Sequence, residues 1–317
     1  MARNYSATEP LRGRERIYYA LGYAGFYLLS LMPFRLLYII SDLIFHILYH
    51  CIKYRRDIVR KNLKECFPEK SEEELQSIER GFYHWFCDYI VETLKMFTLS
   101  KSSARKHITF EGMEHVYEAL DEGHNVALYI AHYCTWEWIT AISLHLPEGV
   151  LAGQVYHILE NKVMDRLVYR LRTRMGTQNI TKHEILRTTV KTMRDGRQLV
   201  IGFISDSAPE IFNVHHWLPF LNHETAVITG SETLAKRCNY ACVYLKMTRK
   251  KRGYYNVKVI PMVKESSTMP DFEITDMYFK LLEETIREAP QYWLWTHNRW
   301  KRSRAVVEAF QAQQKRN

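Results

Sequence analysis

The chain has 317 residues, of which 47% are hydrophobic and 25% charged, and its formal net charge is +9. This length suits one large domain or two small ones, with enough apolar residues for a sizeable core. The basic balance favours acidic partners, such as a nucleic acid, an anionic membrane or an acidic protein. The six cysteines show no metal-ligand spacing and no dense disulfide framework, which indicates a reducing compartment.

The N-terminal region begins with a basic stretch, RGRER at 12–16, followed by an uncharged apolar run at 17–33. A full membrane span needs roughly 20 residues, so this run crosses most of a hydrocarbon core. Its tyrosines suit interfacial anchoring, and the catalytic part of the chain is expected on the positively charged, cytoplasmic side. A cleaved signal peptide would need a small-residue cleavage site, which does not follow. A buried helix is the remaining alternative, and we predict a membrane anchor.

A second apolar segment, 34–52, is interrupted by Arg35, Asp42, His46 and His50. This mixed character predicts a helix that lies in the membrane interface or packs on the folded domain. A cation-rich stretch, 53–61, follows it. We therefore divide the chain into an anchor and interfacial helix at 1–55 and a catalytic domain at 56–317.

The catalytic domain is expected to be α/β, with helices flanking a layered sheet. Ser71 and Glu74 form a capping-box pattern that starts a helix running to about 97. Beyond residue 107 apolar strand-like runs alternate with helical patterns, which favours an α/β layered fold. Strands are predicted at 125–131, 149–156, 198–205, 240–248 and 254–263, and helices at 136–145, 160–175, 183–195, 226–238 and, last, 272–288.

The stretch YIAHYCTWEWI places His132 just past the first of these strands and Glu137 five residues later. Ligand sites in open α/β sheets form at strand carboxyl ends. Residues five apart on a straight helix lie about 140° apart, so the two side chains meet only if His132 is on the turn. This spacing disfavours a zinc site and suits a histidine base oriented by a carboxylate. The alternative is that this spacing arises by chance, because a chain with 14 histidines and 35 acidic residues contains several such pairs.

Covalent catalysis is not indicated. The region around His132 contains no nucleophile-elbow serine. Cys134 lies among aromatic residues, which would raise the pKa of its thiol and make it a poor nucleophile.

Several segments in order give the chain a family resemblance. They are RRDIVRKNLKECFPEKSEEEL, FEGMEHVYEALDEGHNVALYIAHYCTWEW, VYHILENKVMDRLVYRLRTRMG, GRQLVIGFISDSAP, WLPFLNHETAVITGSETLAKRC and APQYWLWTHNRWK. Together they resemble the late acyltransferases of lipid A biosynthesis, the lauroyl- and myristoyl-type enzymes of the lysophospholipid acyltransferase superfamily. The resemblance covers nearly the whole chain and implies a glycerol-phosphate-acyltransferase-like fold.

Matched by position, the resemblance implies that His132 is the general base and Glu137 its partner. It places Arg172, Arg174 and Asp206 at the substrate. Each has a structural alternative: ordinary surface ion pairs for the arginines, and a helix or turn cap for Asp206.

Two positions depart from the family pattern. His157 replaces an arginine and Asn222 replaces a glycine. Both departures leave the His–Glu pair intact and put the identity of the acceptor in doubt.

The resemblance also implies the reaction and the partners. Acyl carrier protein would donate the acyl chain to a hydroxyl of an anionic lipid A precursor, at the cytoplasmic face of the bacterial inner membrane. No cofactor and no metal are expected. The basic stretch 297–304 would hold phosphates or meet the membrane, unless it is a solvated helix end.

Three rival classes remain. A lysophospholipid or another glycolipid could be the acceptor. A nucleic-acid-binding protein would explain the charge but not the apolar N-terminus, and no nucleic-acid motif is present. A structural membrane protein would leave the polar segments unexplained. The sequence does not give the acyl chain length, the acylated position or the oligomeric state.

Overall fold

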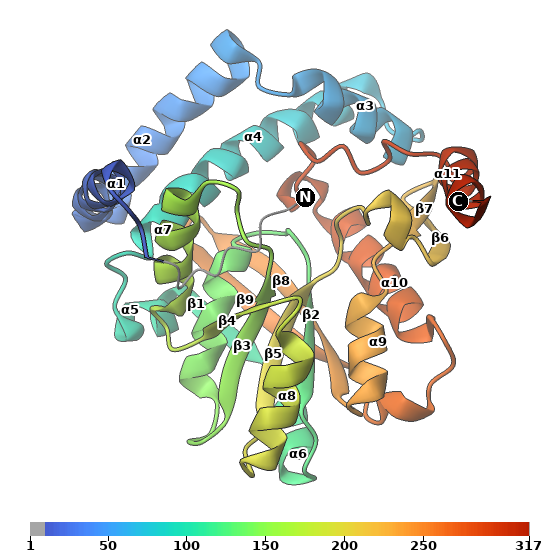
Figure 1. Ribbon diagram of the computed structural model, residues 1–317. Helices are drawn as coiled ribbons and strands as arrows, with labels where there is room; N and C mark the ends of the chain where they lie inside the picture. Colours follow the sequence, from blue (N-terminus) through green and yellow to red (C-terminus); the bar gives the residue numbers. More distant parts are fainter. Residues whose placement is uncertain (1–9, 317) are drawn as a thin grey trace.

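The computed structural model describes residues 10–316, and they form a mixed α/β fold with a central sheet flanked by helices (Figure 1). The sheet has seven strands in the order β1-β9-β8-β2-β5-β3-β4. Strands β8, β2, β5, β3 and β4 run parallel, whereas β9 pairs antiparallel with β8. The expected α/β class with a layered sheet and flanking helices is therefore confirmed.

Five of the seven strands match predicted segments: β2 (Val126–Ile130), β3 (Leu151–Tyr156), β5 (Leu199–Ile204), β8 (Ala241–Lys251) and β9 (Tyr254–Val263). Strands β2 and β5 are buried almost throughout, as parallel strands covered on both faces must be. The two unpredicted strands, β1 (Ile108–Glu111) and β4 (Gln178–Thr181), form the sheet edges. Each has four residues, which is too short for a recognisable periodicity.

Four helices beyond residue 55 match their predictions: α4 (Glu72–Lys95), α7 (Lys162–Thr173), α8 (Ile185–Arg194) and α10 (Glu273–Glu288). The capping box at the start of α4 is confirmed, because the Glu74 amide donates to Ser71 Oγ and the Ser71 amide donates to Glu74. Short helices α3 (Arg56–Cys66), α5 (Lys101–His107) and α6 (Glu114–Asp121) were not predicted.

The helix predicted at 136–145 is present with these bounds and is a 3₁₀ helix. Two other helix predictions need correction. The start of the predicted helix 226–238 belongs to a hairpin of β6 (His216–Phe220) and β7 (His223–Val227), and α9 covers only Gly230–Arg237. The helix predicted at 272–288 is present as α10, but it is not the last one, because α11 (Arg304–Arg316) follows it.

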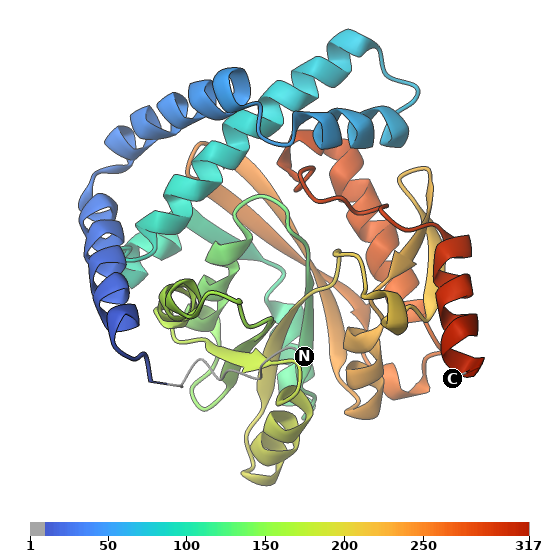
Figure 2. The ribbon, with the colours of Figure 1, turned by 45° about the horizontal axis from the view of Figure 1, so that its top comes forward.

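Two N-terminal helices lie outside α4. They are α1 (Arg14–Leu31) and α2 (Phe34–His46), and a π-helical segment, Ile47–Ile52, extends α2. Helix α2 packs along α4, and α1 packs against α4 and α7. Figure 2 shows this blue pair curving around the outside of α4.

The N-terminal segment of membrane-spanning length is not the predicted one. Among the helices in residues 10–316, only 34–52 is long and apolar enough to cross a membrane by length and composition. Helix α1 begins with Arg14, Glu15 and Arg16, so only part of its length is uncharged. Length and composition alone do not show a span, because buried core helices share them.

Candidate active site

His132 and Asp206 meet at the carboxyl ends of two neighbouring parallel strands. His132 follows β2, Asp206 follows β5, and Ile130 of β2 pairs in register with Ile204 of β5. His132 Nδ1 lies 2.7 Å from Asp206 Oδ1, and the His132 amide donates to Asp206 Oδ2 at 3.0 Å. An ionised carboxylate only accepts, so the bonded Nδ1 carries the proton. The sheet therefore builds a His–Asp pair from residues 74 positions apart.

The Asp206 carboxylate is buried and held by three donors. Besides the two groups of His132, the Trp293 indole N–H donates to Oδ2 at 2.9 Å. Burial alone would raise the pKa of this carboxyl. The charge of His132 and the three hydrogen bonds outweigh burial and lower the pKa to about 2. Asp206 is therefore a fixed anion at neutral pH.

The His132 ring is the solvent-accessible member of the pair, with 28% of its side chain exposed against 3% for Asp206. Burial acts to lower the pKa of the imidazole, but the charge and hydrogen bond of Asp206 raise it above its usual value. The edge of the ring meets Trp136, with centroids 5.2 Å apart. The ring is thus oriented through Nδ1, and the opposite nitrogen is the one available for chemistry.

Glu137 makes its hydrogen bonds to Arg172 and not to His132. It lies in the first turn of the 3₁₀ helix, as expected, but its carboxylate receives Arg172 Nε at 2.8 Å and Nη2 at 2.5 Å. This bidentate pair joins the 3₁₀ helix to α7 and is largely buried. Burial acts to lower the pKa of Arg172. The charge and hydrogen bonds of Glu137 outweigh burial, so the pKa of Arg172 is raised above its usual value. The predicted hydrogen-bonded pair of His132 and Glu137 is therefore not formed, because His132 pairs with Asp206 and Glu137 with Arg172.

The predicted arginine pair is split. Arg172 is half-buried beside Glu137, whereas Arg174 is exposed at the C-terminal end of α7 and makes a long contact, 3.5 Å, with the Leu99 carbonyl. Two residues along a helix correspond to about 200°, so the side chains of such a pair point to different faces. The structure thus brings His132, Asp206, Glu137 and Arg172 into one region and leaves Arg174 outside their hydrogen bonds.

The segment APQYWLWTHNRWK, residues 289–301, also lines this region. Tyr133 forms an isolated β-bridge with Trp293, and the Leu294 amide donates to the His132 carbonyl at 3.2 Å. Burial lowers the pKa of His297 to about 4, and Arg299, Asp206 and His132 are among the charges that act on it. The role of Trp293 was not predicted, because an indole far along the chain gives no local signal.

Cys134 is not a nucleophile in this arrangement. It is completely buried, and burial raises the pKa of its thiol well above the usual value. Its positive φ of 50° turns the chain between His132 and the 3₁₀ helix. Among residues 10–316, no group of three or more His, Cys, Asp or Glu side chains has metal-binding geometry.

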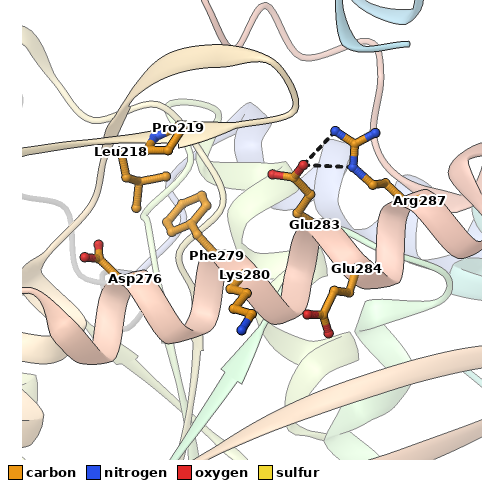
Figure 3. A pocket seen from close by; sticks show the side chains of 8 residues that line it. All are labelled: Leu218, Pro219, Asp276, Phe279, Lys280, Glu283, Glu284 and Arg287. Carbon is orange, nitrogen blue, oxygen red and sulfur yellow. Dashed lines mark hydrogen bonds and ion pairs between the residues drawn. The ribbon is translucent and has the colours of Figure 1, made fainter. Parts of the chain in front are cut away.

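Two large cavities lie elsewhere. One, of about 490 Å³, separates the β6–β7 hairpin from α10 and is lined by Leu218, Phe279 and Glu283 among others (Figure 3). The other, also about 490 Å³, lies between β4 and α8. Neither is lined by His132, Asp206, Glu137 or Arg172.

A His–Asp pair at adjacent strand ends, with an arginine–glutamate pair beside it, is an arrangement suited to general-base catalysis. The family model described as bacterial lipid A biosynthesis acyltransferase matches residues 10–302. The chain belongs to this family, and it is an acyltransferase.

Curated relatives cover most of the chain at low identity. A lipid A biosynthesis lauroyltransferase of Escherichia coli is 24% identical over 285 residues, which is 89% of this chain and 90% of the relative. A palmitoleoyltransferase of the same organism is 24% identical over 81% of this chain and 82% of its own length. A lipid A biosynthesis acyltransferase of Haemophilus influenzae is 21% identical over 87% of this chain and 85% of its own length.

Proposed function

We propose that the protein transfers a fatty acyl chain from acyl carrier protein to a hydroxyl of a lipid A precursor, with His132 as general base. The observation that carries this proposal is the 2.7 Å bond between His132 Nδ1 and Asp206. It fixes the tautomer in which Nε2 has a free lone pair. Family membership supports the reaction class and the type of acceptor.

The mechanism is direct transfer. His132 Nε2 takes the proton of the acceptor hydroxyl as its oxygen attacks the thioester carbonyl. The tetrahedral intermediate then collapses, the C–S bond breaks, and the imidazolium returns the proton to the leaving thiolate. Asp206 stabilises the imidazolium throughout and keeps its own charge. No covalent acyl-enzyme is needed.

Arg172 is the proposed stabiliser of negative charge. Its guanidinium has five N–H donors, and Glu137 receives bonds from Nε and Nη2. The remaining donors can face the oxyanion or a phosphate of the acceptor. Glu137 then acts as a positioning residue that holds Arg172, a different role from the base partner that the sequence suggested.

The donor and acceptor are both anionic in this proposal. A basic chain of net charge +9 attracts an acidic carrier protein and a phosphorylated glycolipid. Segment 297–304 contributes Arg299, which is buried, and Lys301, which is exposed. The Arg299 guanidinium donates to the Ala226 carbonyl at 2.8 Å and has a buried Nε without a partner in the described chain. These cations are proposed to receive acceptor phosphates.

The enzyme is proposed to act at the cytoplasmic face of the bacterial inner membrane, where the apolar N-terminal helices meet lipid. We further propose that residues 1–55 supply membrane attachment and 56–317 supply catalysis, without a bound cofactor or metal. Neither departure from the family pattern alters the His–Asp pair: Asn222 turns the β6–β7 hairpin with φ of 65° and donates to the Cys66 carbonyl, and His157 is exposed after β3.

The test is acyl transfer from acyl carrier protein to a lipid A precursor, with the product identified by mass spectrometry. His132→Ala should lose about 10² to 10⁴ in rate, because the hydroxyl is no longer deprotonated. Asp206→Ala should lose a similar factor, and the double variant should be little worse than either, since the pair acts as one unit. His124→Ala is the control, because His124 precedes β2 at the opposite end of the same strand.

A folded His132→Ala variant that transfers acyl chains at nearly the wild-type rate would refute the proposed mechanism. Acylation of a lysophospholipid or another glycolipid in place of the lipid A precursor would retain the mechanism and change the acceptor.

A further inference from the structure

Large apolar side chains are exposed together on the N-terminal helices. In residues 10–314 most of the exposed large hydrophobic residues fall between 17 and 54, and Leu21, Leu28 and Ile39 are 66%, 64% and 64% exposed. The others in this group are Ile17, Tyr18, Tyr27, Leu29, Leu31, Leu36, Leu43, Ile47, Ile52 and Tyr54. We call α1, α2 and the π-helical segment 47–52 the apolar arc. A patch of this extent marks an interaction surface.

The inner face of α2 is fixed to the protein. Leu37, Ser41 and Phe45 recur every four residues and are buried, so one stripe of the helix faces α4. Ser41 Oγ donates to Asp88 of α4 at 2.7 Å, and the Tyr38 hydroxyl donates to Glu92 at 2.9 Å. Helix α2 therefore presents lipid-like side chains on its outer face only.

Ion pairs lie behind the middle of this helix. Arg252 of the β8–β9 turn donates to Asp42 at 2.6 Å and to Asp88 at 2.6 Å, and Arg249 donates to Asp88 at 2.6 Å. A charged residue at the bilayer centre costs about 2.5–3.5 kcal/mol even by the lower scales. A span by 34–52 would take these charges, α4 and the β8–β9 turn into the hydrocarbon. Segment 34–52 therefore cannot cross the membrane in this fold.

Helix α1 is held in a similar way. Its uncharged part, 17–31, is about 22 Å long at ~1.5 Å per residue, shorter than the ~30 Å hydrocarbon core. The Arg170 guanidinium of α7 lies over the Tyr23 ring at 4.2 Å and donates to the Tyr19 hydroxyl. Tyr23 and Phe26 also meet Phe97, with ring centroids 5.8 and 6.0 Å apart. A span by α1 would break these contacts.

We infer that the apolar arc lies in the plane of one leaflet and that neither helix crosses the bilayer. This inference deepens the membrane attachment proposed above. The occupant is a lipid leaflet with anionic headgroups, because exposed cations lie along the ends of the arc's helices. They are Arg12 before α1, Arg14 and Arg16 in its first turn, Arg35 in the first turn of α2, and Lys53 and Arg55 after 52. Membrane docking then leaves both chain ends on the side of the catalytic domain.

Topology is the first test. The full chain carries one cleavable tag at the N-terminus or at the C-terminus, and protease is added to intact spheroplasts and to inverted vesicles. Both tags should resist protease in spheroplasts and be cut in inverted vesicles. Cutting of the N-terminal tag in spheroplasts while the C-terminal tag resists would show a span and overturn the inference.

Depth in the membrane is the second test. Leu43→Cys and Val190→Cys are each labelled with a fluorophore in a background without the native cysteines, and mixed with vesicles containing phosphatidylglycerol and brominated lipids. Leu43 and Val190 are similarly exposed, at 61% and 56%, but Val190 lies on α8, away from the arc. The Leu43 label should be quenched at least five-fold more, and more strongly by bromine near the headgroup than by bromine near the chain end.

Equal quenching at the two positions, or strongest quenching from the bilayer centre, would overturn in-plane docking. Neither test measures acyl transfer. A protein that docks as described but transfers no acyl chain would refute the proposed function alone.

Discussion

At the residue scale, the charge on Asp206 raises the pKa of His132, the proposed base. The pKa of His132 is raised above 6.5 because the Asp206 interaction outweighs burial, and a base must be neutral to act. The rate should therefore rise with pH through a pKa above 6.5. Asp206→Asn removes the charge and leaves the burial, so the acid limb of kcat/KM should move to lower pH while the plateau falls about 10² to 10⁴-fold.

The pH profile of Asp206→Asn separates this role from a merely structural one. An acid limb that stays in place would mean that Asp206 does not interact with the base during catalysis. Folding of the variant is checked by circular dichroism.

The Glu137–Arg172 pair gives a second residue-scale prediction. Arg172→Lys keeps the charge but loses the bidentate fork, so transfer should fall strongly, and Arg172→Ala should fall further. Glu137→Gln should move the pH profile less than Asp206→Asn, because Glu137 bonds Arg172 and not His132. Arg174→Ala, at the neighbouring exposed position, is the matched control. Near-wild-type turnover of both Arg172 variants would remove Arg172 from the mechanism.

At the element scale, helix α3 supports the segment that holds Asp206. The buried Asn62 amide of α3 donates to the Trp295 carbonyl at 2.9 Å and to the His297 carbonyl at 3.1 Å. Arg55, just before α3, donates to the Thr296 carbonyl at 3.0 Å. Trp293, two residues before this turn, bonds Asp206. Two segments of the family resemblance, far apart in sequence, thus meet beside the site.

Asn62→Ala should lower the free energy of unfolding by about 1–3 kcal/mol, because the two carbonyls lose a buried donor. It should also lower kcat while changing KM less, because Trp293 is then misplaced. Thermal unfolding and steady-state kinetics measure the two effects. Asn125→Ala is the control: Asn125 is buried just before β2 and accepts the Leu199 amide at 2.7 Å. It should lose stability with little change in kcat, and an equal kcat loss in both variants would deny α3 its positioning role.

At the scale of the whole molecule, Glu92 joins three elements at a buried point. Its carboxylate on α4 receives the hydroxyls of Tyr38 of α2 and Tyr255 of β9. Burial raises the pKa of Glu92 to about 7, against the hydrogen bonds and the charge of Arg249, which lower it. A carboxyl with a raised pKa binds its proton more tightly in the folded state. Its contribution to stability is therefore full below the unfolded pKa, near 4.5, and declines as pH rises towards 7.

Glu92→Gln should flatten the pH dependence of the melting temperature between about 4.5 and 7, because the group no longer titrates. Melting curves across this interval measure the effect. An unchanged slope would mean that other groups set the pH dependence, and Glu74→Gln on the exposed first turn of α4 serves as the control.

The sequence by itself determined the α/β class, most strands of the sheet, the capping box of α4 and the position of His132 past a buried strand. These features follow from local periodicity and turn chemistry, which lie within a few neighbouring residues. The family resemblance added Arg172 and Asp206 as site residues. Tertiary structure alone decided which carboxylate meets His132, because the pairing of β2 with β5 brings Asp206, just past β5, to His132, just past β2, across 74 residues. It also decided that α2 is fixed to the folded domain, because Asp42 of α2 and Asp88 of α4 both pair with Arg252 of the distant β8–β9 turn.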